Sequence, residues 1–222
     1  SIICSSAYLP YDIKLLNSEF QIYKWGYFPA TKSYSIADLK KIKKHTCPYI
    51  LWVGRLIQLK HPQHAVIAAK VLRDNGYVFN GPLRTKLEKL VTRYGLTDCI
   101  HFQGSKKTDE VRSYMERANI FLFTSDKHEG WGAVLNESMN SGCAVIASHA
   151  AGAVPFLIND GENGLVYESG NVKHLIACMK RVLDNPQYCE TLGLKAYDTI
   201  TKFWNPDVAT ERLYKTIEAK IN

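Results

Sequence analysis

The sequence predicts an α/β fold, a Rossmann-like parallel sheet with helices on both of its faces. From Cys47 onward, short apolar runs alternate with segments whose apolar residues recur at helical spacing, and glycines follow several of these segments. Strands that alternate with helices form a parallel sheet, because each crossover helix covers one face. The chain of 222 residues is long enough for one complete domain of about 150 residues with further segments.

Five apolar runs are expected to be strands: residues 48–54, 99–103, 120–123, 144–147 and, as a shorter strand, 165–167. Helices are expected over residues 61–75, 83–94, 133–141 and 172–183. Pro62 suits the first position of the first of these helices, and Gly142 ends the third. Thr108 is expected to cap a further helix, and Asn205 to start the last one.

The connection between the helices at 61–75 and 83–94 is too short for the strand that a parallel sheet needs there. Tyr77, Val78 and Phe79 alone would make a stub beside the central strand and leave buried backbone groups unpaired. We therefore expect several residues to be absent from this sequence between Phe79 and Asn80, whose Cα atoms would then lie farther apart than about 3.8 Å. A functional deletion is the alternative.

The two ends of the chain differ from this domain. Residues 1–45 are interpreted as the remnant of an N-terminal domain and a linker, residues 46–204 as the Rossmann-like domain, and residues 205–222 as a helix that packs toward the N-terminal domain. The chain is thus expected to be a piece of a larger two-domain protein. Four lysines of the linker are expected to be solvated, with contact to an anionic membrane as the alternative; they are Lys40, Lys41, Lys43 and Lys44.

The composition excludes several classes of protein. With 46% hydrophobic and 22% charged residues, the chain is not disordered, collagen-like or a coiled coil, and no apolar run is long enough to cross a bilayer. No signal peptide is visible, and six cysteines without C-x-x-C spacing indicate reduced thiols in a cytosolic protein. The net charge of +7 favours acidic ligands or an anionic surface without identifying either.

The loop after the first predicted strand carries two cations, Arg55 and Lys60. In parallel α/β sheets, ligands bind at the carboxyl ends of the strands, beside the positive N-termini of helices. Two cations at that place suit a diphosphate, although a solvated charge is the commoner role of any single lysine or arginine. No G-x-G-x-x-G or G-x-x-x-x-G-K-[ST] motif is present, which argues against a dinucleotide cofactor and a nucleoside triphosphatase.

A second loop, at residues 126–132, carries Glu129, and the helix that follows it carries Glu137. Carboxylates accept hydrogen bonds from hydroxyls, so sugars and ribose are natural partners, and the loop glycines let the backbone approach a ligand. Each glutamate alone also has an ordinary interpretation, at a helix N-terminus or on the surface. Trp131 is equally suited to stack on a sugar or to pack against the loop, and His128 is interpreted as an ordinary loop histidine.

The segment Glu129-Gly130-Trp131-Gly132-Ala133-Val134-Leu135-Asn136-Glu137 matches the E-x7-E motif of the family 4 retaining glycosyltransferases, which have the GT-B fold. The resemblance continues through residues 139–147, 154–158 and 160–164, and it covers roughly residues 46 to 200. Gly54-Arg55-Leu56 with Lys60 is similar to the family's G-R-L-x-x-x-K motif. Two departures are His61, where the family often has glycine, and Trp131, where phenylalanine is commoner.

By this resemblance, the chain is the C-terminal half of a GT-B fold, and residues 46–204 bind a nucleotide sugar. Arg55 and Lys60 would bind the donor diphosphate and offset the charge of the departing nucleotide. Glu137 would bind the ribose hydroxyls, and Glu129 would contact the donor sugar. The backbone around that sugar would come from Gly130, Trp131 and Gly132, and the residues near the base would be Gly104 and Ser105. Glu129, Arg55 and Lys60 are therefore the catalytic residues that the resemblance implies.

Similar enzymes need no metal, so the resemblance implies no metal or cofactor and a UDP-sugar or GDP-sugar as substrate. The acceptor would be a glycan or a lipid-linked molecule in cell-surface polysaccharide synthesis. The protein would be cytoplasmic and would contact the inner face of the membrane peripherally. Because the acceptor site lies between two domains, this chain alone would turn over poorly or not at all. Retention is explained by attack from the face of the leaving group, so neither glutamate is expected to be a nucleophile.

Two other functions are consistent with parts of the sequence. A non-catalytic module that binds nucleotide sugars would keep the same motifs without transferring a sugar. A nucleic-acid binder is suggested by the net charge and by the aromatic content of 11%. No concentrated basic face or RNA-binding motif supports it, so nucleic acid is not expected as a partner.

Overall fold

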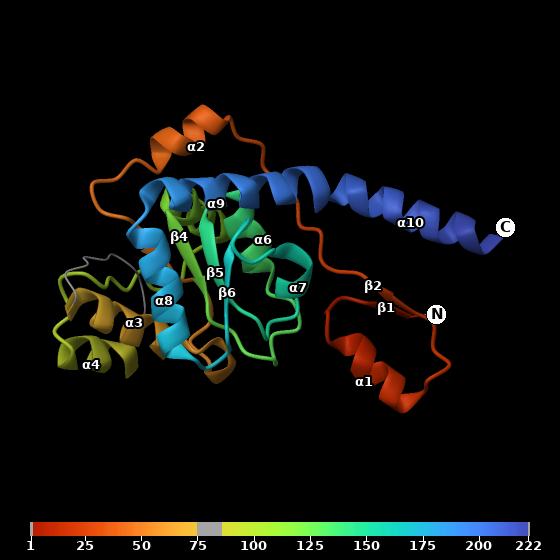
Figure 1. Cartoon of the computed structure of the whole chain (residues 1–222), viewed down its shortest axis with the longest axis horizontal. Coiled ribbons are helices and arrows are strands. Elements are labelled where there is room, and N and C mark those ends of the chain that lie inside the picture. The colour runs from red at the N-terminus through yellow and green to blue at the C-terminus, as the bar shows by residue number, and fades with distance from the viewer. Residues whose placement is uncertain (1, 75–85, 222) are drawn as a thin grey trace.

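The computed structural model describes residues 2–74 and 86–221, which form two parallel sheets (Figure 1). The larger sheet has the strand order β3-β4-β5-β6, and each neighbouring pair is parallel. The smaller sheet pairs β1 with β2, also in parallel. The strands are β1 (Ile2–Cys4), β2 (Ile22–Lys24), β3 (Ile50–Leu51), β4 (Ile120–Phe123), β5 (Ala144–Ser148) and β6 (Leu165–Tyr167).

Helices connect and cover these strands. Those in the described ranges are α1 (Leu9–Leu16), α2 (Ile36–Ile42), α3 (Pro62–Asp74), α4 (Lys86–Arg93), α5 (Thr108–Arg117), α6 (Ala133–Asn140), α7 (Val154–Leu157), α8 (Val172–Leu183), α9 (Pro186–Asp198) and α10 (Pro206–Ile221). A short 3-10 helix, Gln58–Lys60, precedes α3, and a π-helix, Thr199–Phe203, joins α9 to α10. None of the helices described in these ranges is long and apolar enough to cross a membrane.

The larger sheet is buried on both faces, which explains why its strands lack a polar side. All four residues of β4 are buried, and successive side chains point to opposite faces. Ile120 and Leu122 pack into an apolar cluster with α3 and α8, whereas Phe121 and Phe123 pack into a second cluster with α6. The predicted α/β fold, a parallel sheet with helices on both faces, is therefore confirmed.

The predicted strands are confirmed at β4, β5 and β6, but not at every position. The run at residues 48–54 is paired only at Ile50 and Leu51. The strand predicted at residues 99–103 is wrong. The backbone N–H groups of Cys99 and Ile100, which are both buried, donate to the Leu96 carbonyl at 3.2 and 3.0 Å, so the segment begins in a turn and joins no sheet ladder.

The helices predicted at residues 133–141 and 172–183 are confirmed, and the helix predicted at residues 61–75 is confirmed over Pro62–Asp74, since residue 75 lies outside the described residues. The last helix is also confirmed, and Asn205 Oδ1 accepts the Val208 N–H at 3.0 Å as a helix cap. The helix predicted at residues 83–94 is confirmed over the described residues of α4. Its start lies outside the described residues, as does the predicted break between Phe79 and Asn80.

One helix start and two whole helices differ from expectation. Thr108 is the first helical residue rather than the cap, and the Glu110 carboxylate accepts the Lys107 backbone N–H at 3.1 Å instead. Helix α7, which residues 151–153 precede, is not among the predicted elements. Helix α9 is not among the predicted elements, because the side that it buries includes Gly193 and therefore shows no continuous apolar band.

The lysine-rich linker lies on the domain, so the prediction that all of its lysines are solvated is wrong. The Lys43 ammonium donates to the carbonyls of Met115, at 3.1 Å, and of Ala118. Burial lowers the pKa of Lys43. Lys40 pairs with Glu190 of α9 at 2.6 Å. These contacts hold the linker against α5 and α9.

The N-terminal segment meets the start of α10 in an aromatic cluster. The rings of Phe28 and Trp204 are stacked with centroids 4.7 Å apart, and Trp204 Nε1 donates to the Tyr27 carbonyl at 2.9 Å. Trp204 also stacks on Trp131, with centroids 5.7 Å apart. The two ends of the chain therefore both pack against the loop that precedes α6.

Gly142 follows α6 in the left-handed region, with a φ of 69°. An added Cβ would also lie 3.3 Å from Leu39 Cδ1. We expect Gly142→Ala to lower the free energy of unfolding by about 1–2 kcal/mol, the cost of a residue with a Cβ in this conformation. Urea denaturation measures the change. Gly130→Ala is the control, since an added Cβ there meets nothing within 4 Å. Equal stability of Gly142→Ala and the unchanged chain would contradict this account.

Candidate functional site

Two loops at the carboxyl ends of β3 and β4 are joined by hydrogen bonds. The backbone N–H of Asp126 donates to the Leu59 carbonyl at 2.9 Å. The Thr124 hydroxyl donates to the Lys60 carbonyl at 2.5 Å and accepts from Trp52 Nε1 at 2.8 Å. These bonds place the loop that carries Lys60 beside the loop that carries Glu129.

Lys60 and Glu129 form an ion pair between the two loops. Their side chains are only 13% and 14% exposed, so the pair is largely shielded from solvent. The Ser125 hydroxyl donates to the same carboxylate oxygen of Glu129 at 3.0 Å. The structure thus brings together two of the residues predicted to bind the donor, and each neutralises the charge of the other.

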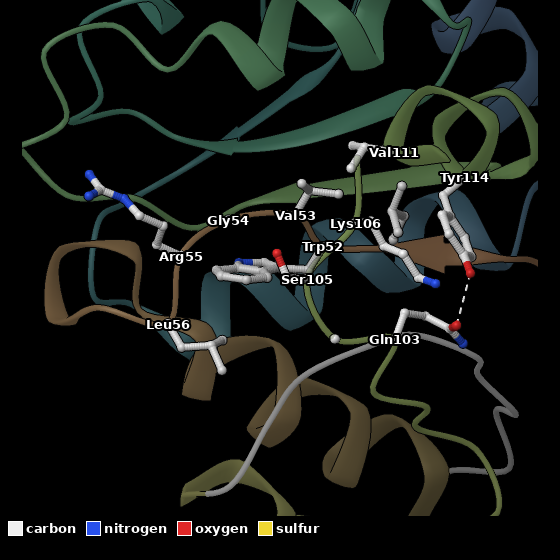
Figure 2. A pocket seen from close by; sticks show the side chains of 12 residues that line it. Trp52, Val53, Gly54, Arg55, Leu56, Gln103, Ser105, Lys106, Val111 and Tyr114 are labelled. Atoms are coloured by element: carbon white, nitrogen blue, oxygen red, sulfur yellow. Dashed lines mark hydrogen bonds between the residues drawn. The ribbon is translucent and has the colours of Figure 1, made fainter. Parts of the chain in front are cut away.

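Arg55 lies at the edge of a pocket of about 380 Å³. The predicted residues Gly104 and Ser105 line the same pocket, together with Trp52 and Lys106 (Figure 2). The Arg55 guanidinium points away from the Ser105 side of the pocket and makes no hydrogen bond or ion pair with the described residues. It is therefore free to take an anionic partner.

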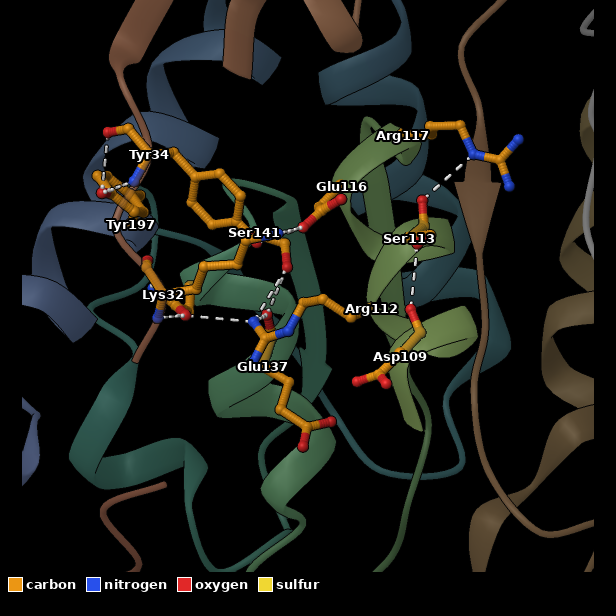
Figure 3. A network of polar contacts seen from close by, with 11 residues as sticks. Lys32, Tyr34, Asp109, Arg112, Ser113, Glu116, Arg117, Glu137, Ser141 and Tyr197 are labelled. Carbon is orange, nitrogen blue, oxygen red and sulfur yellow. Dashed lines mark hydrogen bonds and ion pairs between the residues drawn. The ribbon is translucent and has the colours of Figure 1, made fainter. Parts of the chain in front are cut away.

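Glu137 lies on α6, where Arg112 of α5 approaches its backbone. The Arg112 guanidinium donates to the Glu137 carbonyl at 3.1 Å and to Asn140 and Ser141 at 3.2 and 3.3 Å. Figure 3 shows the Glu137 carboxylate directed away from that guanidinium. Burial raises the pKa of Glu137, and the charge of Arg112 offsets only part of this effect. In the part of the chain that the structure describes, this half-buried carboxylate has no hydrogen-bonding partner.

Trp131 is buried, which favours its packing interpretation over stacking on a sugar. Its ring is 3% exposed, and its Nε1 donates to Asn136 Oδ1 at 2.8 Å. Gly132 has a φ of 92°, and a Cβ there would meet the Phe123 ring at 2.3 Å. Gly130, in contrast, is exposed and has open space where a Cβ would be. The Gly130 backbone is therefore the part of this tripeptide that a ligand can approach most closely.

Three polar residues of the site are absent from the sequence-based prediction. Lys106 directly follows Ser105, and this adjacency is a signal that could have identified it. Arg112 and Asp126 show no such signal, because their contacts depend on how α5 and the loop after β4 fold. Among the described residues, no group of three or more His, Cys, Asp or Glu side chains could hold a metal ion.

The sequence model of the glycosyl transferases group 1 family matches residues 36–199. A 2-deoxystreptamine glucosyltransferase from Streptomyces kanamyceticus is 34% identical over 162 residues, which is 68% of this chain and 41% of that protein. The amylovoran biosynthesis glycosyltransferase AmsK from Erwinia amylovora is 27% identical over 180 residues, or 76% of this chain and 44% of that protein. The chain thus spans less than half the length of these two relatives.

Solved structures show the same fold. A sucrose-phosphate synthase from Thermosynechococcus elongatus superimposes with a TM-score of 0.76 at 24% identity, covering 98% of this chain and 58% of that one. HepE from Anabaena, solved in complex with UDP, superimposes with a TM-score of 0.78 at 18% identity, covering 98% of this chain and 63% of that one. The similar structures are GT-B glycosyltransferases, so the expected GT-B architecture is confirmed.

Proposed function

Because the chain belongs to the glycosyl transferases group 1 family, we propose that it is the donor-binding domain of a retaining glycosyltransferase. Its substrate is a nucleoside-diphosphate sugar, with UDP or GDP as the nucleotide. The observation that carries this proposal is the Lys60–Glu129 pair between two loops at the carboxyl end of the sheet. A cation for phosphate and a carboxylate for hydroxyls are thereby held side by side, and the loop that presents Lys60 also carries Arg55.

The proposed roles follow from the charges at these positions. Arg55 and Lys60 bind the diphosphate and stabilise the negative charge that develops on the departing nucleotide. Glu129 accepts hydrogen bonds from hydroxyls of the donor sugar, next to the open backbone of Gly130. Glu137, whose carboxylate lacks a partner among the described residues, accepts hydrogen bonds from the ribose. Cations of the protein take the place that a metal has in other transferases, and no metal is required.

The acceptor site lies outside this domain. We place the acceptor, a glycan or a lipid-linked molecule, between residues 46–204 and an N-terminal domain. Residues 1–45 are the remnant of that domain and its linker, and α10 packs toward it. The relative AmsK is named for amylovoran biosynthesis, which supports a role in polysaccharide synthesis. We place that synthesis at the cell surface and the protein at the cytoplasmic face of the membrane. If the linker lysines contact the membrane, Lys43 is not among the residues that do so, because its ammonium is bound inside the protein.

A thermal-shift screen with UDP, GDP, ADP and UMP tests the proposal. UDP or GDP is expected to raise the melting temperature, since a ligand at 100 times its Kd stabilises the folded chain by about 2.7 kcal/mol. UMP is the matched control, because it keeps the base and the ribose but lacks the second phosphate that Arg55 and Lys60 bind. No shift with any nucleoside diphosphate, or an equal shift with UMP and UDP, would contradict the proposed site.

The alternative of a non-catalytic module predicts the same nucleotide binding. The two hypotheses differ in what they predict for the full-length protein. A non-catalytic module would transfer no radiolabelled sugar to lipid extracts or oligosaccharides. Detection of a labelled product that requires Glu129 would exclude that alternative.

A further inference from the structure

His61, which directly follows Lys60, has a left-handed backbone conformation with a φ of 43°. Within residues 2–74 and 86–221, every other residue with a positive φ is a glycine. This conformation is unfavourable for a residue with a Cβ, and glycine adopts it without that cost. A strained conformation in a ligand-binding loop is a reason to ask what the side chain contributes.

The imidazole of His61 is hydrogen-bonded on both nitrogens. Its Nε2 lies 2.8 Å from Asp126 Oδ2, and its Nδ1 lies 3.3 Å from Gln63 Nε2. Because the Gln63 amide donates to Nδ1, Nε2 carries the proton that is donated to Asp126. The ring also stacks on His64 of α3, with centroids 4.8 Å apart and an interplanar angle of 11°. The side chain is therefore fixed in position as well as in direction.

Asp126 is held equally firmly from the other side. Its Oδ1 accepts from the His128 backbone N–H at 2.9 Å and lies 3.0 Å from His128 Nδ1. Burial alone would raise the pKa of Asp126, but the hydrogen bonds from His128 and His61 lower it, so the carboxylate stays charged. His61 thus binds a fixed anion in the loop that also carries Glu129, three residues further along the chain.

We propose that His61 is a positioning residue that holds Lys60 at the donor diphosphate. The His61–Asp126 hydrogen bond links the loop that presents Lys60 to the loop that presents Glu129, directly beside the Lys60–Glu129 ion pair. A glycine at this position would adopt the same backbone conformation but would lose the link. This inference rests on the proposed function, since it assigns Lys60 to the diphosphate.

Two substitutions in the 222-residue chain separate positioning from stability. His61→Gly removes the imidazole and also removes the Cβ that makes the positive φ unfavourable. His61→Gln retains an amide N–H near the position of Nε2, and its Cβ keeps the positive φ unfavourable. We expect His61→Gly to melt at the same or a higher temperature and yet to bind UDP about tenfold more weakly. His61→Gln is expected to melt at a lower temperature than His61→Gly but to bind UDP within about threefold of the unchanged chain. A merely structural role would make affinity follow the melting temperature.

Hydrogen–deuterium exchange provides a readout that does not depend on nucleotide. Without nucleotide, peptides that cover residues 124–132 are expected to exchange faster in His61→Gly and at the unchanged rate in His61→Gln. Unchanged exchange in His61→Gly, unchanged UDP affinity in that variant, or equal loss of affinity in both variants would overturn the positioning role. If the unchanged chain binds neither UDP nor GDP, the proposed function fails, and the exchange rates alone decide whether His61 fixes the loops.

Discussion

Replacing Lys60 with alanine is expected to raise the Kd for UDP about 10- to 150-fold. A hydrogen bond to a charged group contributes about 1.5–3 kcal/mol, which corresponds to this range. In the free chain the substitution also leaves Glu129 without its cation, so a largely shielded carboxylate faces the diphosphate. Loss of attraction and new repulsion both weaken binding, and the effect should therefore exceed that of Arg55→Ala, whose guanidinium is not paired with the described residues.

Isothermal titration of UDP into Lys60→Ala, Arg55→Ala and Lys127→Ala measures these differences. Lys127→Ala is the matched control, because it removes one positive charge from the same site region but from an exposed side chain. It is expected to bind UDP within about twofold of the unchanged chain, as expected for a solvated charge. If Lys60→Ala and Lys127→Ala bind UDP equally well, Lys60 does not contact the diphosphate, and the assigned site is wrong.

The fold could be predicted largely from local patterns. The β4 and β5 strands are continuous apolar runs because both faces of their sheet are covered, and α8 shows one apolar side because it covers that sheet. Residues 99–103 look like a strand because the segment carries the apolar residues Cys99, Ile100 and Phe102, of which Cys99 and Ile100 are buried. Whether such a run joins a ladder depends on a neighbouring strand, which composition does not reveal.

The candidate site could be predicted only in part. The motif spacing identifies Lys60 and Glu129, and general rules for parallel sheets place both at the same edge. The contact of Lys43 with the Met115 carbonyl and the contact of His61 with Asp126 link residues more than sixty positions apart. Such contacts are set by tertiary packing. From the sequence alone, His61 is only a difference from the glycine that the family often has, and its role depends on its φ and its partner.

Glu129 and Glu137 are expected to divide between transfer and binding. In the full-length protein that the proposed function requires, Glu129→Gln should lower kcat about 100-fold, the scale for losing one group that stabilises the reacting centre. Its effect on the Kd for UDP should be small, because UDP lacks the sugar that Glu129 contacts. Glu137→Gln should instead weaken UDP binding about tenfold, since ribose contacts persist through the reaction. Steady-state rates and UDP titrations on the same two variants test this division, and the opposite pattern would refute both roles.

Glu137→Gln carries a second expectation that concerns stability. The folded chain raises the pKa of Glu137 above its ordinary value of 4.5, chiefly by burial, so folding favours the neutral form of this carboxyl. The stability that this group contributes is present below its unfolded pKa and is lost as the pH rises through the raised folded pKa. Glutamine stays neutral at every pH and avoids that loss. Urea denaturation should therefore show Glu137→Gln more stable relative to the unchanged chain at pH 7 than at pH 4, although it binds UDP more weakly. If the stability gained by Glu137→Gln is the same at both pH values, or larger at pH 4, the Glu137 carboxylate has a partner in the free chain. It would then not be available to accept hydrogen bonds from the ribose.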